Sequence, residues 1–219
     1  DDYYTGFASF YDGEYLDALT DFRDSAKGGI KAGDERYIDA ICYHSMLGEC
    51  YYQLGDLTQA LDQFSSSIKY FIANRDWMLR TEFPATIDLA QQAKVITWGK
   101  SARTFRVGRY PDHYSTLVGR LDNDKVAQVG GVIANPQLYP VNVIEIWRCL
   151  AQSIRRRREI LGPVCEYEPL TPLILDALAR RPGPPSHWSQ CWISVSLGTA
   201  LHSAKKDEQA ISEFTQSLL

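Results

Sequence analysis

The chain of 219 residues contains no long apolar run and no visible secretory signal. A helix that crosses a membrane needs about 20 consecutive apolar residues, so no transmembrane helix is expected. Without a signal peptide we expect a cytoplasmic location. The chain begins at Asp1 rather than at a methionine. We therefore expect either a piece of a longer protein or a chain whose targeting segment has been removed.

The residues that usually build metal or redox sites are few and scattered. The five cysteines form no Cys-x2-Cys pair and their number is odd, which favours buried free thiols over disulfides. The four histidines show no metal-ligand spacing. Asp122 and Asp124 begin like a calcium loop, but the ligands and the glycine that should follow are absent. We therefore expect no bound metal.

Signatures of catalysis are equally scarce. There is no phosphate-binding loop and no Gly-x-Gly-x2-Gly fingerprint. The most enzyme-like group is a set of polar residues in one irregular segment: Arg109, Asp112, His113 and Arg120. Proximity in sequence is its only support. The sequence therefore predicts no enzyme activity, no catalytic residues and no cofactor.

Charge of one sign is concentrated in the middle of the chain. Residues 94–181 hold fourteen Lys or Arg and eight Asp or Glu, whereas the remainder holds nine and nineteen. Such a division can steer a charged partner. It can also reflect contacts between segments of the same chain, or solvated faces.

What the chain does contain is one pattern that occurs three times. Gly48 is followed twelve positions later by Ala60 and four positions later again by Phe64. The same spacing occurs in two further sets, Gly6, Ala18 and Phe22, and Gly198, Ala210 and Phe214. Each copy has a turn signal between the small residues. A repeat in one register predicts repeated helix-turn-helix units that stack on their neighbours.

The middle copy reads His44-x2-Leu47-Gly48-x2-Tyr51 and then Ala60-x3-Phe64, which resembles the tetratricopeptide repeat. The first and third copies lack the tyrosine, and no copy carries the family's tryptophan. The resemblance covers residues 1–32, 37–74 and 191–219. It implies an all-α fold, an α-solenoid of antiparallel helix pairs in one domain over 1–219. The middle, 75–190, would be divergent helix, with an irregular insertion near 106–140.

Local signals predict the individual elements. Helices are expected over 1–10 and 14–27, from Asp34 as N-cap to about Gln53, from Asp56 to about Leu79, from Pro84 to about Phe105, over 141–161 and 171–181, and from Ser186 onward. His113–Leu121 is a candidate short helix. The rest of 106–140 is expected to form a protruding loop or an extended segment.

In tetratricopeptide repeats the first helices of successive units line a concave groove. The resemblance places these residues in it: Tyr3, Phe7 and Phe10; Cys42, Ser45, Glu49 and Tyr52; and Trp192, Val195, Thr199 and His202. It implies a protein- or peptide-binding scaffold, and the aromatic strip of the first unit suits an apolar or amphipathic peptide. None of these positions is Lys, Arg or Asn, so we do not expect capture of a peptide's terminal carboxylate. Alternatively, the aromatic strip is buried against another repeat or a second copy, which would make the chain a structural homo-oligomer module.

The densest charge run is Arg155 to Arg158. Arg155 and Arg156 are candidate contacts for nucleic acid or another anionic ligand within the basic segment 94–181. The simpler interpretation is a solvated helix end, where cations are favoured by the helix dipole and pair with nearby glutamates.

Overall fold

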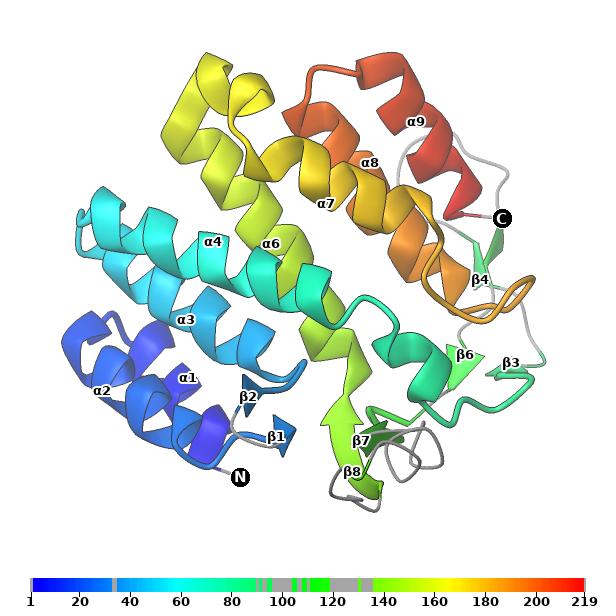
Figure 1. Cartoon of the computed structure of the whole chain (residues 1–219), viewed down its shortest axis with the longest axis horizontal. Coiled ribbons are helices and arrows are strands. Elements are labelled where there is room, and N and C mark those ends of the chain that lie inside the picture. The colour runs from blue at the N-terminus through cyan, green and yellow to red at the C-terminus, as the bar shows by residue number, and fades with distance from the viewer. Residues whose placement is uncertain are drawn as a thin grey trace.

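The computed structural model describes residues 2–32, 35–89, 91, 94–95, 104–105, 108–109, 111–118, 130 and 136–218. Within these ranges the fold is mainly helical, with short antiparallel strand pairs (Figure 1). The α-helices are α1 Gly6–Tyr11, α2 Tyr15–Ala26, α3 Ala40–Gln53, α4 Leu57–Ala73, α6 Val143–Leu161, α7 Leu170–Ala179, α8 Gln190–Ser203 and α9 Asp207–Gln216. Short 3-10 helices are η1 Asp2–Tyr4, η2 Trp77–Arg80 and η3 Gly162–Tyr167.

The three copies of the repeat form three packed helix pairs, α1 with α2, α3 with α4 and α8 with α9. In each pair the repeat glycine lies against the ring of the repeat phenylalanine on the second helix. A β-carbon built on Gly6, Gly48 or Gly198 would lie 2.6–2.9 Å from that ring. Real β-carbons do not approach so closely, so the glycine accommodates a phenylalanine ring rather than another helix backbone. The repeat alanines are also buried.

The turn inside each pair has the same backbone geometry. The residue seven positions after the repeat glycine has a positive φ, which is +83° at Gly13, +80° at Gly55 and +56° at Lys205. The next residue donates its N–H to a carbonyl five positions earlier, at 2.9 Å in all three turns. Asp56 also caps α4, because its side chain accepts the N–H of Gln59. The helix start predicted at Asp56 is therefore confirmed.

The start of α3 differs from the prediction. The helix begins at Ala40, six residues after the predicted cap Asp34, which lies outside the described residues. A short hairpin of β1 Lys31–Ala32 and β2 Glu35–Arg36 precedes it. The carboxylate of Asp39 accepts the N–H of Ile30 at 2.8 Å and closes this hairpin onto the helix. That contact spans nine residues, so helical periodicity alone could not reveal it.

Two other boundaries are corrected. The helix predicted to reach Leu79 ends at Ala73, because the chain turns at Asn74 and buries Trp77 completely from a 3-10 turn. The helix α8 begins at Gln190, not at Ser186, whose φ of +53° is incompatible with a helix.

The largest error concerns residues 84–118. The helix predicted from Pro84 to Phe105 is wrong, since its described residues include short strands instead. These are β3 Asp88–Leu89 paired with β6 Gly108–Arg109, and β4 Lys94–Val95 paired with β5 Thr104–Phe105. The short helix predicted at His113–Leu121 is the strand β7 His113–Val118. It pairs antiparallel with β8 Gln137–Asn142, which leads directly into α6 (Figure 1).

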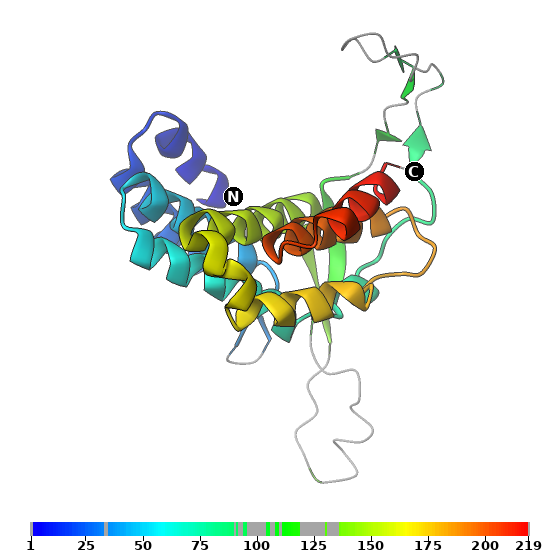
Figure 2. The same ribbon diagram turned by 90° about the horizontal axis from the view of Figure 1, so that it is seen from above.

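The helix α6 is the centre of the molecule. It packs against α3 and α4 on one side and against α8 on the other, and α7 contacts α4 and α8. In Figure 2 α4 and α7 lie on the lower side of α6, so the helices form two layers. The helix predicted over 141–161 is confirmed, and its side chains Val143, Trp147, Leu150 and Ile154 are buried.

The main core lies between α3, α4, α6, α7 and α8, with Trp77, Phe71 and Leu150 among its fully buried side chains. A smaller cluster beneath α1 and α2 contains Phe22, Met46 and Cys50. Both clusters meet at α3. In the described part of the chain, no helix combines the length and apolarity that a membrane span requires.

Candidate functional site

The predicted groove residues of the first unit lie on η1 and α1, and two of them contact side chains of α6. Tyr3 donates its hydroxyl hydrogen to Glu145 Oε1 at 2.6 Å. Phe7 is half-buried, and the guanidinium carbon of Arg148 lies 5.8 Å from the centre of its ring. Phe10 is also half-buried and packs on the small core cluster. The aromatic strip is therefore partly covered by α6 of the same chain.

The predicted residues of the second unit are divided. Ser45 is fully buried and donates to the carbonyl of Cys149 on α6. Glu49 is 2% exposed and accepts two hydrogen bonds from Arg156, at 2.7 and 2.9 Å. Tyr52 remains half-buried, with the guanidinium carbon of Arg156 4.1 Å from its ring centre. Buried Cys42 also faces α6.

The predicted residues of the third unit lie on α8 and are not joined to the other two sets. Trp192 packs against Phe83, and Val195 is 40% exposed. The Thr199 hydroxyl donates to the carbonyl of Val195. His202 contacts Asp207 at 2.6 Å. The helix α6 stands between α3 and α8, so the structure brings together only the residues of the first two units.

The arginine run is mostly neutralised by carboxylates. Arg156 pairs with Glu49 and also with Glu159 at 2.6 Å. Arg157 is buried and pairs with Glu168. Arg155 is the more exposed of the two predicted anion contacts and lies 3.5 Å from Glu159. The simpler interpretation from the sequence was a solvated helix end paired with nearby glutamates. The pairing is confirmed for Glu159 and Glu168, but the solvated end is wrong for Arg156 and Arg157, whose side chains are largely buried.

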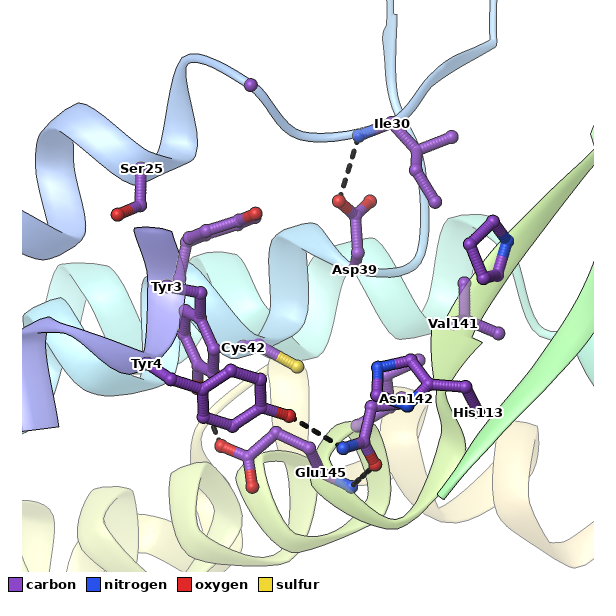
Figure 3. Close-up of a pocket in the computed structure, with 14 residues that line it drawn as sticks. Tyr3, Tyr4, Ser25, Ile30, Asp39, Cys42, His113, Val141, Asn142 and Glu145 are labelled. Carbon is purple, nitrogen blue, oxygen red and sulfur yellow. Dashed lines mark hydrogen bonds between the residues drawn. The ribbon is translucent and has the colours of Figure 1, made fainter. Parts of the chain in front are cut away.

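A pocket of about 460 Å³ opens beside the first unit, between η1, the start of α3, and the β8–α6 junction (Figure 3). Fourteen residues of the described part of the chain line it. Three tyrosines contribute rings or hydroxyls: Tyr3, Tyr4 and Tyr43. Two carboxylates, Asp39 and Glu145, also line the pocket. None of the described residues that line it is Lys or Arg.

Hydrogen bonds fix the wall formed by the β8–α6 junction. Asn142 accepts the N–H of Glu145 at 3.0 Å and so caps α6, while its amide donates to the hydroxyl of Tyr4 at 2.6 Å. Burial by itself raises the pKa of Glu145, but hydrogen bonds from Arg148 and Tyr3 and the charge of Arg148 outweigh it, so that pKa is lowered. Glu145 is therefore a carboxylate at neutral pH.

The opposite wall holds Asp39, whose pKa is raised because the carboxyl is buried. Its Oδ2 accepts the N–H of Ile30, and its Oδ1 has no hydrogen-bond partner among the described residues. At the floor, a hydrogen bond with Cys149 and burial raise the pKa of the Cys42 thiol. The Cys42 thiol is therefore protonated and poorly nucleophilic.

Sequence reasoning did not identify this pocket. Its walls come from segments more than a hundred residues apart, so no local spacing connects Tyr3 with Glu145. One signal was available: Asn142 stands three residues before Glu145 at the start of a strongly apolar-periodic segment, which indicates a helix cap. Of the enzyme-like group, His113 lines the pocket and Arg120 lies outside the described residues. Among the described residues, no group of three His, Cys, Asp or Glu could hold a metal ion.

No protein-family model matches this chain, and comparisons with curated proteins and with solved structures find no similar one.

Proposed function

We propose that this chain is a protein- or peptide-binding scaffold built of stacked helix pairs, similar to tetratricopeptide-repeat proteins. The observation that supports the architecture is the shared geometry of the three pairs. Each has a glycine against a phenylalanine ring and the same turn with a positive φ. Rigid stacked helices hold side chains in fixed positions, so that binding costs little ordering of the scaffold.

The binding face we propose is the seam where α1 and α3 meet α6. Two half-buried aromatic side chains at predicted groove positions, Phe7 and Tyr52, each lie beneath an arginine of α6. Aromatic residues and arginine contribute most of the binding energy in many protein interfaces. Glu145 and Glu49 hold Arg148 and Arg156 in place. This pairing of fixed arginines with aromatic rings is the observation that carries the proposal.

The seam also indicates the chemistry of the partner. Arg148 is 40% exposed even though it pairs with Glu145, so it can still donate hydrogen bonds. Phe7 and Tyr52 offer apolar area beside it. An amphipathic peptide with aromatic or aliphatic anchors and an acidic or amide group fits such a surface.

The test is selection of peptides from a random library on the immobilised chain, followed by calorimetric affinities for the enriched peptides. Phe7→Ala and Tyr52→Ala should each weaken binding at least about tenfold. Tyr167→Ala is the matched control, since Tyr167 is 81% exposed on η3, away from the seam. The proposal fails if no peptide is enriched, or if the affinity survives both seam substitutions in a folded protein.

The alternatives have less support. Nucleic-acid binding through 94–181 would need free arginines, yet Arg156 and Arg157 are committed to carboxylates. A homo-oligomer contact could use exposed Tyr11 and Leu16 of the first pair. Sedimentation at high protein concentration tests that contact. The cytoplasmic location expected from the sequence remains a prediction.

A further inference from the structure

The pocket beside the first unit has the composition of a site for a cation. Its described lining combines three tyrosine side chains with two carboxylates and contains no Lys or Arg. Its volume of about 460 Å³ lies within the range of small-molecule sites, roughly 300–1,000 Å³. The nearby Arg148 compensates Glu145 from outside the pocket. Among the described residues Asp39 makes no ion pair within 4 Å. The charge of nearby Arg36, which is not among the described residues that line the pocket, favours the Asp39 carboxylate only in part, because burial still raises the Asp39 pKa.

The tyrosine rings meet nearly at right angles. Tyr3 and Tyr4 have centroids 5.2 Å apart and planes at 75°, and Tyr3 and Tyr43 are 5.3 Å apart at 86°. In a perpendicular pair the edge of one ring points at the face of the other, so the rings are held at fixed angles to one another. The faces of aromatic rings carry the negative lobe of the quadrupole. In Figure 3 Tyr3 and Tyr4 stand on one side of the pocket, and His113 and Asn142 stand on the other. Such aromatic walls attract ammonium groups, alkylated ones in particular.

An anionic ligand fits less well, although two helices begin at this pocket. The N–H groups that a helix start usually offers to an anion are already used. The N–H of Ala40, Ile41 and Cys42 donate to carbonyls of the preceding turn. At the start of α6 the N–H of Glu145 is taken by Asn142. An anion would therefore meet two carboxylates and few free donors.

From this arrangement we infer that the pocket binds an alkylammonium group, with the cation between the tyrosine rings and Asp39. The ammonium can belong to a free small molecule or to an alkylated lysine side chain of a partner, because both present the same head. Burial holds the pKa of Asp39 above its ordinary range. A bound cation would relieve this by stabilising the carboxylate. The inference does not rest on the proposed peptide-binding seam.

Two calorimetric titrations of the whole chain test the inference. One uses choline, and the other uses its uncharged isostere, in which carbon replaces nitrogen. Choline should bind, and the isostere should bind at least about tenfold more weakly, because it lacks the charge. An acetylated trimethyllysine amide forms the second arm. Tighter binding of this amide than of choline assigns the site to a partner's side chain, and the reverse assigns it to a small molecule.

Variants locate the site. Asp39→Asn keeps an oxygen for the Ile30 N–H but removes the charge, and Tyr4→Leu removes a ring; each should weaken choline binding about tenfold. Tyr4→Phe keeps the ring and should retain most of the affinity. Tyr11→Leu is the control, since Tyr11 is 79% exposed and does not line the pocket. Tyr52→Ala should leave choline binding intact, which separates this site from the seam. Phe7 does not serve as such a control, because its ring packs on those of Tyr3 and Tyr4.

Several results would overturn the inference: no heat of binding at millimolar choline, equal affinity for the uncharged isostere, or an affinity unchanged in a folded Asp39→Asn variant. Preferential binding of acetate or phosphate over choline would also reject it.

Discussion

Gly48 and Phe64 are in contact so close that a β-carbon on Gly48 would lie 2.6 Å from a ring carbon of Phe64. The ring is fully buried and cannot move away without disturbing the α3–α4 pair. Gly198 and Phe214 repeat this relationship at 2.7 Å. The glycine is therefore required by packing rather than by backbone conformation, because none of the repeat glycines has a positive φ.

Gly48→Ala should destabilise the chain by about 1–3 kcal/mol, the usual cost of overpacking, although alanine favours a helix by about 1 kcal/mol. Urea denaturation measures the effect. Gly28→Ala is the control, since a β-carbon there meets nothing closer than 3.6 Å. Adding Phe64→Leu to Gly48→Ala should recover part of the loss. If Gly48→Ala were as stable as the native chain, the contact would not be the reason for the glycine.

This contact also explains which parts of the fold the sequence could predict. Three repeated spacings located α1 to α4 and α8 to α9, because the same local packing recurs at each. The strand β7 was missed because Tyr114 and Leu117 have helical spacing. The structure instead buries Tyr114, Thr116 and Val118, which alternate along a strand. Whether residues 113–118 form a strand or a helix depends on pairing with β8, about twenty residues later, and not on local sequence.

The candidate sites were less predictable for the same reason. Glu49 was expected to line an open groove, yet it is buried against Arg156, which lies 107 positions away. A position in the repeat pattern can place a side chain on one face of a helix, but it does not show which later helix covers that face. The pocket depends on Tyr3 and Glu145, whose contact spans 142 positions. A single sequence does not indicate such a pairing.

Gly55 and Lys205 occupy equivalent positions in two turns, so removing the glycine from the first and introducing a glycine at the second should have opposite effects on stability. Gly55 has a φ of +80°, so Gly55→Ala should cost about 1 kcal/mol through backbone strain. Lys205 occupies the same place in the last pair with a φ of +56°. Lys205→Gly should be at least as stable as the native chain, whereas Lys205→Ala should not gain. Thermal unfolding of the three variants tests this, and destabilisation by Lys205→Gly would mean that the Glu166 contact matters more than the strain.

The ion pair between Glu49 and Arg156 should be far more important to stability than the exposed arginine beside it. Glu49→Gln leaves a largely buried guanidinium without its main carboxylate, which we expect to cost about 2–4 kcal/mol. Arg155→Ala should change stability by less than about 0.5 kcal/mol, because its side chain is 57% exposed. Chemical denaturation compares the two variants. Equal effects would show that burial of the pair contributes little.

Asp39 should contribute more to the stability of the chain in acid than at neutral pH. Because folding raises its pKa, the native state binds this proton more tightly than the unfolded chain does. Its contribution to stability is complete below the unfolded pKa of about 3.9 and is lost as the pH rises through the native pKa. Asp39→Asn should therefore be the more stable protein at neutral pH, and its advantage should shrink as the pH falls. Unfolding free energies at several pH values test this, and an advantage independent of pH would contradict it.

Glu145 should show the opposite dependence. Its pKa is lowered in the folded chain because the Arg148 and Tyr3 hydrogen bonds outweigh the effect of burial. Its contribution is therefore complete above the unfolded pKa of about 4.3 and is lost as the pH falls through the native pKa. Glu145→Gln should cost about 1–3 kcal/mol at neutral pH and progressively less in acid. Glu82→Gln, at an exposed position, should have little effect at any pH.

Because Asp39 and Glu145 face the same pocket, opposite slopes for their variants would show that hydrogen bonding, and not pocket burial alone, determines which carboxylate is stabilised. Parallel slopes would contradict the contacts that Arg148 and Tyr3 make with Glu145.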